Sequence, residues 1–242
     1  LSVAWPGWCG TLTAVNTAGL CVGVLNVPGL VRKADMVGAP YAILFRRMVQ
    51  EAATCDEALE ILRGAARTFS NNVLIAQTRP CPRAVVAEYT ARAVAVREAR
   101  AGQDFIASTN HFRKLGRKAE WPDDAGYSRY PRIVSLLRAG RIGLRTPIFS
   151  RPRVALPNSL HTMIVCPARR AIRLSLGPMP AGRGRYREFQ YGDEGIRLEE
   201  KRDLESNVGC WEGLAGAKVL AGAAPNAQRP PPAVSFSGER SG

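Results

Sequence analysis

Histidine and cysteine, which commonly bind metals in proteins, are scarce and scattered in this sequence. There are two histidines, His111 and His161, and six cysteines with no CxxC spacing among them. Scattered cysteines argue against a zinc site and indicate reduced, mostly structural thiols, which favours a reducing compartment such as the cytoplasm. No metal or organic cofactor is indicated.

Long apolar runs are missing as well. No stretch approaches the ~20 consecutive apolar residues of a membrane span. The opening LSVAWPGW has neither the charged nor the apolar region of a signal peptide. We therefore expect no membrane segment, and the absence of a leading Met suggests a processed or truncated chain.

Acidic residues are few: 20 Asp and Glu stand against 34 Lys and Arg, which gives a net charge of +14. Such an excess suggests nucleic-acid binding, but the arginines are spread along the chain among Ala, Pro and Gly. The densest patches, such as 183–187, adjoin no nucleic-acid motif. We expect only weak, sequence-independent binding to polyanions, and no specific nucleic-acid partner.

The apolar content is sufficient for one substantial domain. Of the 242 residues, 46% are apolar, and a chain of this length buries about 70% or more of its unfolded surface. We predict a single domain over residues 1–223. Residues 224–242 are rich in Pro, Gly, Ser and Ala, and we expect this tail to be disordered.

Residues 9–27 predict a β-hairpin. Cys9–Val15 and Leu20–Val27 are apolar, small and β-branched, and Asn16–Gly19 supplies turn residues between them. Pro28 ends the second strand, because proline cannot donate to the ladder. Asn26 is a polar residue closing an apolar strand, so it either bonds its own turn or serves a site.

Helices and further strands follow the hairpin. Pro40 and the apolar face up to Ala52 predict one helix, and the capping box Thr54–Glu57 opens a second that ends near Gly64. Helices followed by strands predict an α+β protein in which the helix pair covers a sheet. The expected strands are an antiparallel meander at 72–76, 84–89, 93–96 and 105–107, then 161–166 and 171–176.

Two polar residues after the meander are candidates for a site. Asn110, in Ser108-Thr-Asn-His-Phe112, offers an uncharged N–H donor at a strand end. A fixed donor at the oxygen of an attacked amide can lower the barrier by ~3 to 4 kcal/mol, whereas the alternative is an ordinary turn residue. Ser128 is a natural N-cap, which would place Arg129 at a helix start, where the macrodipole disfavours a cation. Arg129 is therefore a site candidate or a solvated helix arginine.

Taken in order, four motifs resemble those of the choloylglycine hydrolase-like group of N-terminal nucleophile hydrolases. They are Asn16-Thr-Ala-Gly-Leu20, Leu25-Asn-Val-Pro28, Thr109-Asn-His-Phe112 and Ser128-Arg129. The nearest branch contains isopenicillin N acyltransferase, the acyl-coenzyme A:6-aminopenicillanic acid acyltransferase-like family, and its cysteine-peptidase relatives. The resemblance covers about residues 8–180.

This resemblance implies a four-layer αββα sandwich of antiparallel sheets. It also implies hydrolysis of a linear amide (C–N) bond, or acyl transfer, on a small-molecule amide or acyl substrate. In the resembling family Asn26 and Asn110 would serve the oxyanion, and Arg129 would position groups near the nucleophile.

The resembling enzymes also use a Cys, Ser or Thr as the first mature residue, whose α-amine acts as base, with an Arg and an Asp shortly after it. This chain begins with Leu1, so we expect the first strands to be missing and the chain alone to hydrolyse no amide. Cleavage before Cys9 would expose a thiol, but too close to Asn26 for the missing strands. The alternative is a non-catalytic degenerate homologue or a basic binding module, and we interpret both histidines as structural.

The resemblance leads to a geometric expectation. If the motifs build one site, Asn26, Asn110 and Arg129 should line one cleft within ~10 Å of one another. Because the strand that carries the nucleophile is expected to be missing, apolar residues such as Leu12 or Val22 should be exposed beside that cleft.

Overall fold

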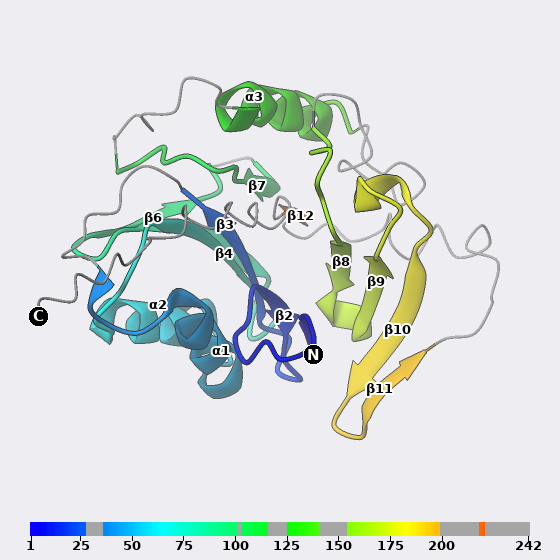
Figure 1. Cartoon of the computed structure of the whole chain (residues 1–242), viewed down its shortest axis with the longest axis horizontal. Coiled ribbons are helices and arrows are strands. Elements are labelled where there is room, and N and C mark those ends of the chain that lie inside the picture. Colours follow the sequence, from blue (N-terminus) through cyan, green and yellow to red (C-terminus); the bar gives the residue numbers. More distant parts are fainter. Residues whose placement is uncertain (28–35, 101–102, 116–124, 141–153, 199–217, 221–242) are drawn as a thin grey trace, which may run out of the picture.

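The computed structural model describes residues 1–27, 36–100, 103–115, 125–140, 154–198 and 218–220. A six-stranded antiparallel sheet occupies the centre of the molecule, with the strands in chain order from β1 to β6 (Figure 1). Its strands are β1 Ser2–Val3, β2 Thr13–Val15, β3 Cys21–Asn26, β4 Asn71–Gln77, β5 Arg83–Tyr89 and β6 Val94–Glu98.

The predicted hairpin is present as β2 and β3, but its first strand is shorter than expected. The turn is closed by Asn16, whose Oδ1 accepts from the Leu20 N–H at 2.9 Å, and by Gly19 at φ +90°. The strand does not begin at Cys9, because the main chain there leaves the sheet: the Thr11 N–H donates to the carbonyl of Ala42 in the first helix.

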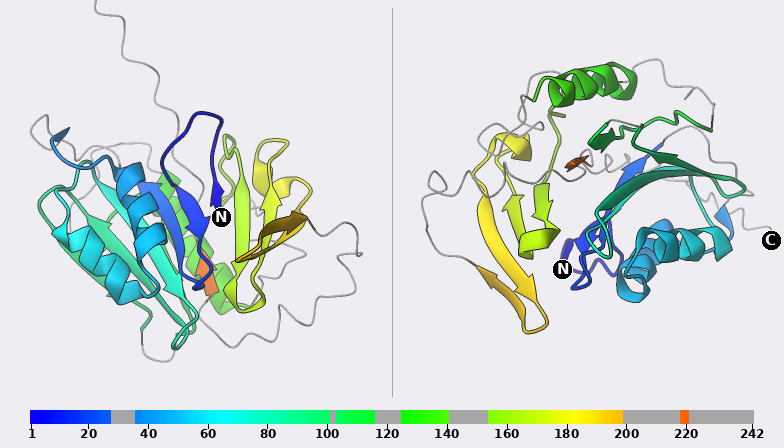
Figure 2. Two further views of the ribbon diagram at one scale, coloured as in Figure 1. Left: turned by 90° about the horizontal axis from the view of Figure 1, so that it is seen from below. Right: turned by 180° about the vertical axis from the view of Figure 1, so that it is seen from behind.

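Helices α1 Tyr41–Glu51 and α2 Cys55–Gly64 cover one face of this sheet, as predicted (Figures 1 and 2). Thr54 caps α2 by accepting from the Glu57 N–H at 3.3 Å, and the Glu57 carboxylate in turn accepts from the Ala53 N–H at 2.7 Å. The apolar stripes of both helices pack on the sheet. The core between them contains Leu44, Phe45, Met48, Leu59, Leu62, Val22, Val24, Val73, Ile75 and Tyr89.

The expectation that Leu12 or Val22 would be exposed is wrong. Their side chains are 4% and 2% exposed, and both belong to the core under the helix pair. Alternate residues of a strand share a face, so Val22 points with Val24 toward α1 and α2. The helix pair therefore buries the hairpin surface that we expected to be open.

A second antiparallel sheet, of four strands, packs against the other face of the first. Its order is β11-β10-β9-β8, from β8 Thr162–Cys166, β9 Ala171–Ser175, β10 Arg187–Gly192 and β11 Gly195–Leu198. Ile172 and Tyr191 from this sheet pack against Leu74 and Val86 of the first. Sequence analysis predicted β8 and β9 but missed β10 and β11. The strand β10 is mostly half-exposed and β11 is exposed, so neither carries a clear apolar signal.

The strand β7 Phe105–Ala107 was predicted as the last strand of the meander, and this prediction is wrong. Instead β7 pairs in parallel with β12 Lys218–Leu220, on the face of the first sheet opposite the helix pair (Figure 1). Both of its faces are buried, since Ile106 joins the core between the sheets while Phe105 and Ala107 pack under the third helix. A strand apolar on both faces fits an interior layer better than a sheet edge.

The third helix, α3 Ala125–Arg138, begins earlier than predicted. Ser128 is therefore not its N-cap, and Arg129 lies in the second turn rather than at the helix start. Ile133, Leu136 and Leu137 pack on Phe105 and Ala107. The predicted α+β class with antiparallel sheets is confirmed, and β7 and α3 hold the segment between them, 108–115, against the first sheet.

Several predictions lie partly or wholly outside the described residues. The tail 224–242 is outside them, so its disorder and the single domain over 1–223 stay predictions. The five described cysteines are unpaired, with Cys21, Cys55 and Cys166 buried. No helix in the described part of the chain is long and apolar enough to cross a membrane.

Candidate functional site

Asn110 is held at both ends of its side-chain amide. Its Nδ2 donates to the main-chain oxygen of Asn26 at 2.9 Å, and its Oδ1 accepts from Nη2 of Arg129 at 2.6 Å. Asn26 ends β3, Asn110 follows β7, and Arg129 lies on α3. The fold thus brings together the three residues that the sequence singled out.

Arg129 fixes the orientation of this amide. Its side chain is only 6% exposed, and a buried guanidinium needs oxygen acceptors around it. A guanidinium has donors but no acceptor atom, so Arg129 bonds the Oδ1 of Asn110. The NH₂ group of Asn110 then points away from Arg129. Arg129 therefore turns the donor end of Asn110 toward β3.

Asn26 meets Asn110 through its main chain rather than its side chain. The Val24 N–H donates to the Leu12 carbonyl, so even-numbered N–H and C=O groups of β3 point toward β2, whereas the Val27 N–H donates to Ser70 on the other side. The Asn26 N–H points the same way as that of Val24, beyond the end of β2. Among the described residues it has no acceptor.

The side chain of Asn26 is half-buried and, by strand alternation, lies on the same face as Val24. It makes no hydrogen bond to another described residue. Asn26 therefore places two main-chain groups beside Asn110. Its carbonyl already accepts from Asn110, and its N–H has no acceptor among the described residues.

Asn72 and Glu88, side by side on β4 and β5, anchor the segment that carries Asn110. Nδ2 of Asn72 donates to the carbonyl of Thr109 at 2.7 Å and to that of His111 at 2.8 Å. The carbonyls before and after Asn110 are therefore both tied to the same side chain, which is fully buried.

The Glu88 carboxylate is also fully buried and accepts from three consecutive main-chain N–H groups. These belong to Arg113 at 2.9 Å, Lys114 at 2.6 Å and Leu115 at 2.9 Å. Nε of Arg97 donates to it at 2.6 Å, and Nη2 of Arg97 reaches the carbonyl of Ala107 in β7 at 3.2 Å. The segment is thus fastened on both sides of Asn110.

Sequence reasoning gave no role to Asn72 or Glu88. The available signal was a polar residue inside an otherwise apolar strand: Glu88 follows Ala-Val-Val-Ala, and Asn72 precedes Val-Leu-Ile. A carboxylate within such a strand must be paired or hydrogen-bonded once buried. The sequence could not show that its partners would come from residues 113–115.

The model of the acyl-coenzyme A:6-aminopenicillanic acid acyl-transferase family matches residues 4–141, which include Asn26, Asn110 and Arg129. The chain belongs to this family. The matched region contains the hairpin, the helix pair, the strands that follow it and α3.

A solved structure supports the fold of this family member. The chain is similar to a Caenorhabditis elegans N-acylethanolamine-hydrolyzing acid amidase ortholog, with a TM-score of 0.52 and 15% sequence identity over 82% of this chain and 81% of that one. At this identity the likeness shows the fold alone. A search of curated proteins found no matching sequence.

The Leu1 amine and the Cys9 thiol are the two groups of this chain that sequence analysis considered as a base or a nucleophile. The Leu1 ammonium donates to the Val15 carbonyl at 2.7 Å, and burial lowers its pKa. Val15 pairs with Cys21, so Leu1 is about five residues of strand, or about 17 Å, from Asn26. Cys9 is exposed, and its carbonyl accepts from Arg46 of α1 at 2.8 Å.

The two histidines occupy structural settings. Nδ1 of His111 is 2.8 Å from Oγ1 of Thr109, and its ring packs edge-on against Tyr130. His161 contacts the ring of Trp5, and burial lowers its pKa. Among the described residues, no group of three His, Cys, Asp or Glu side chains is placed to hold a metal ion.

Proposed function

We propose that the chain is the oxyanion-stabilising part of an amide hydrolase or acyltransferase with the four-layer αββα fold of N-terminal nucleophile hydrolases. The observation that carries this proposal is the double fixation of the Asn110 amide by Asn26 and Arg129. Three core clusters support the layer order, since they join the helix pair to the first sheet, that sheet to the second β layer, and β7 to α3.

The chemistry follows from the donors that remain. A primary amide has two N–H groups, and Asn110 uses one of them on the Asn26 carbonyl. The second, together with the main-chain N–H of Asn26, can face an oxygen on which negative charge grows during attack at an amide carbonyl. Each fixed donor of this kind lowers the barrier by ~3 to 4 kcal/mol.

Arg129 has a positioning role in this proposal. It withdraws electron density from Oδ1 of Asn110 and so makes the opposite N–H groups more acidic donors. Because Oδ1 already accepts from Arg129, the amide does not rotate when substrate enters. The donors are therefore prepared before the reaction begins.

The nucleophile and the base are not supplied by Leu1, whose amine is at the opposite end of the hairpin. We therefore expect the isolated chain to bind amide substrates without turning them over. The second candidate function is a non-catalytic homologue that binds its ligand in the same site, since the fixed Asn110 amide would serve such a ligand equally well.

Asn110→Asp is the most informative variant. Aspartate keeps the shape of the side chain and forms an ion pair with Arg129, so the fold should survive, but both N–H donors are lost. Asn158→Ala, at an exposed turn residue, is the matched control.

The assay combines turnover with binding. Acyl-amino acids and penicillin-type amides are tested for hydrolysis, and the side-chain resonance of Asn110 is followed by NMR as each is added. The proposal expects a shift of that resonance in the wild type and in Asn158→Ala. Asn110→Asp has no side-chain NH₂ resonance, so binding to this variant is followed at the main-chain amide of Asn26, whose shift should be lost. Absence of any shift, with a folded protein, would sink it.

Turnover of these amides, if it occurs, should fall about 100-fold or more in Asn110→Asp. Turnover that disappears in Cys9→Ala would instead assign the nucleophile to Cys9. Turnover unaffected by either change would show that the mechanism lies elsewhere.

A further inference from the structure

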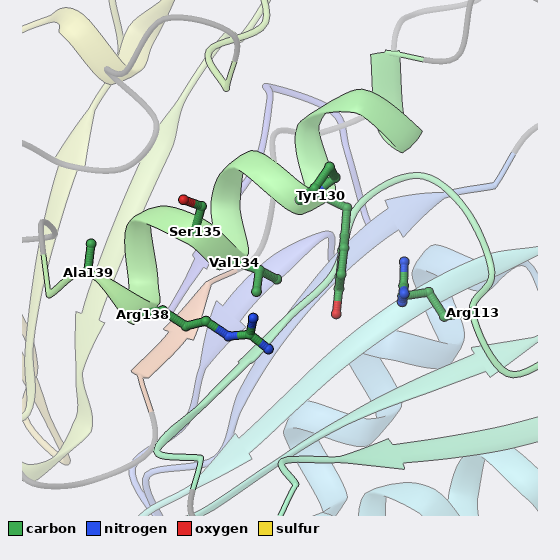
Figure 3. Close-up of a pocket in the computed structure, with 7 residues that line it drawn as sticks. Arg113, Tyr130, Val134, Ser135, Arg138 and Ala139 are labelled. Carbon is green, nitrogen blue, oxygen red and sulfur yellow. The ribbon is translucent and has the colours of Figure 1, made fainter.

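A groove of about 780 Å³ runs along α3, on a part of the helix that the proposed oxyanion site does not use. Tyr130, Val134 and Arg138 form one side of it, and Arg113 stands opposite, from the segment after Asn110 (Figure 3). Residues four apart on a helix lie on one stripe, which explains why these three share the groove. Asn26, Asn110 and Arg129 are not among its lining residues.

The charged groups of the groove are both cationic. Arg113 and Arg138 line it, and no Asp or Glu is among its described lining residues. Some other described arginines are paired with carboxylates, as Arg47 is with Glu51 and Arg83 with Asp56. Neither Arg113 nor Arg138 has an acidic partner among the described residues. Within the described part of the chain, the groove thus holds two guanidinium groups that no carboxylate pairs with.

Arg113 is held in place rather than free to swing into solvent. Its guanidinium carbon lies 3.9 Å from the centroid of the Tyr130 ring, and this ring also packs edge-on against His111. The main-chain N–H of Arg113 is bound by Glu88. A cation stacked on an aromatic ring keeps its outward N–H groups available for an anion.

Apart from Ser135, the rest of the described wall is formed by apolar and aromatic side chains. Figure 3 shows the Tyr130 ring between Arg113 and Arg138, with Val134 beside it, and Pro131 also lines the groove. The volume lies within the range of small-molecule sites, ~300 to 1,000 Å³. A ligand that satisfies this groove therefore needs an acidic group for the arginines and an apolar body for Tyr130 and Val134.

We propose that this groove binds small organic carboxylates with an aromatic or acyl body, the acidic group being bound by the guanidinium groups that line the groove. The planar guanidinium matches a carboxylate with two parallel hydrogen bonds. This inference goes beyond the proposed function, because no oxyanion-site residue contributes to the groove.

Binding to the full chain is measured by isothermal titration calorimetry with N-benzoylglycine as the probe. Its neutral counterpart, N-benzoylglycinamide, has the same body without the charge, and inorganic phosphate has charge without the body. We expect N-benzoylglycine to bind about tenfold or more tightly than either. Equal binding of the neutral amide would overturn the role of the arginines, and equal or tighter binding of phosphate would overturn the choice of an organic carboxylate.

Variants locate the binding. Arg113→Gln and Arg138→Gln should each weaken the binding of N-benzoylglycine about five- to tenfold. The double variant should bind it no more tightly than the wild type binds N-benzoylglycinamide. Arg132→Gln is the matched control, since Arg132 is an exposed arginine on the same helix that does not line the groove. An equal loss in Arg132→Gln would show general charge attraction and refute a groove, as would a double variant that binds normally.

Discussion

Replacing Glu88 by Gln tests whether a buried carboxylate fixes the segment that carries Asn110. The wild-type carboxylate accepts from three main-chain N–H groups and from Arg97, with no solvent contact. Glutamine has nearly the same shape but only one oxygen, so its NH₂ group must face at least one donor. The charge that balances Arg97, whose side chain is 14% exposed, is also lost.

The expected cost is large for a single conservative change. Breaking a buried ion pair costs ~3 to 5 kcal/mol of stability. Each lost hydrogen bond to a charged group costs ~1.5 to 3 kcal/mol, and this cost is part of the first figure rather than added to it. We expect the free energy of unfolding to fall by about 3 kcal/mol or more, within the ~5 to 15 kcal/mol that a typical domain has. The variant should therefore fold with a lower urea midpoint.

Glu98→Gln is the matched control. Glu98 is also a strand glutamate bound to an arginine, Arg83, but its side chain is 54% exposed and accepts from no main-chain N–H in the described chain. An exposed pair of this kind contributes ~1 kcal/mol or less.

Hydrogen exchange tests whether the stability lost in Glu88→Gln comes from the segment that carries Asn110. The amides of residues 113–115 should exchange faster in Glu88→Gln than in the wild type or in Glu98→Gln, because they lose their acceptor. The NMR resonance of the Asn110 side chain should broaden in Glu88→Gln alone. If both variants lose equal stability, or if the 113–115 amides stay protected, the reasoning about Glu88 is refuted.

Three further predictions concern the rest of the molecule. Thr54→Ala should lower the stability by ~1 kcal/mol through loss of the α2 cap, measured as a lower melting temperature, and an unchanged melting temperature would contradict the cap. At pH 8, iodoacetamide should modify the exposed Cys9 and Cys81 before the buried Cys21 and Cys55. Burial raises the pKa of both buried thiols to about 12, so almost none of either is present as the reactive thiolate. Mass spectrometry of samples taken at early time points decides the order. Binding to nucleic acid should be weak and fall steeply as salt rises, and a salt-tolerant, sequence-specific complex would favour a binding module.

Much of the fold is local in origin and could be predicted from the sequence. Asn16 and Gly19 make a hairpin turn through bonds within a few residues, and the Thr54 cap needs only Glu57 three residues later. The apolar stripes of α1 and α2 follow from helical periodicity. The motifs containing Asn26, Asn110 and Arg129 could be recognised for the same reason, since each lies within a short stretch.

What the sequence could not determine depended on contacts between distant segments. Whether β7 continued the meander or entered a separate layer depended on its burial from both sides, between the first sheet and α3. The strands β10 and β11 carry a weak apolar pattern and are defined by pairing with β9 and with each other.

The site shows the same division. The sequence by itself determined that Asn110 is an uncharged donor after a strand, and that Asn26 closes another. Only the tertiary structure decided that Asn26 would contribute its main chain, and that Asn72 and Glu88 would hold the Asn110 segment. The physical reason is that strand direction sets which way a main-chain N–H points, and a buried carboxylate finds its donors wherever the fold brings unpaired amides within reach.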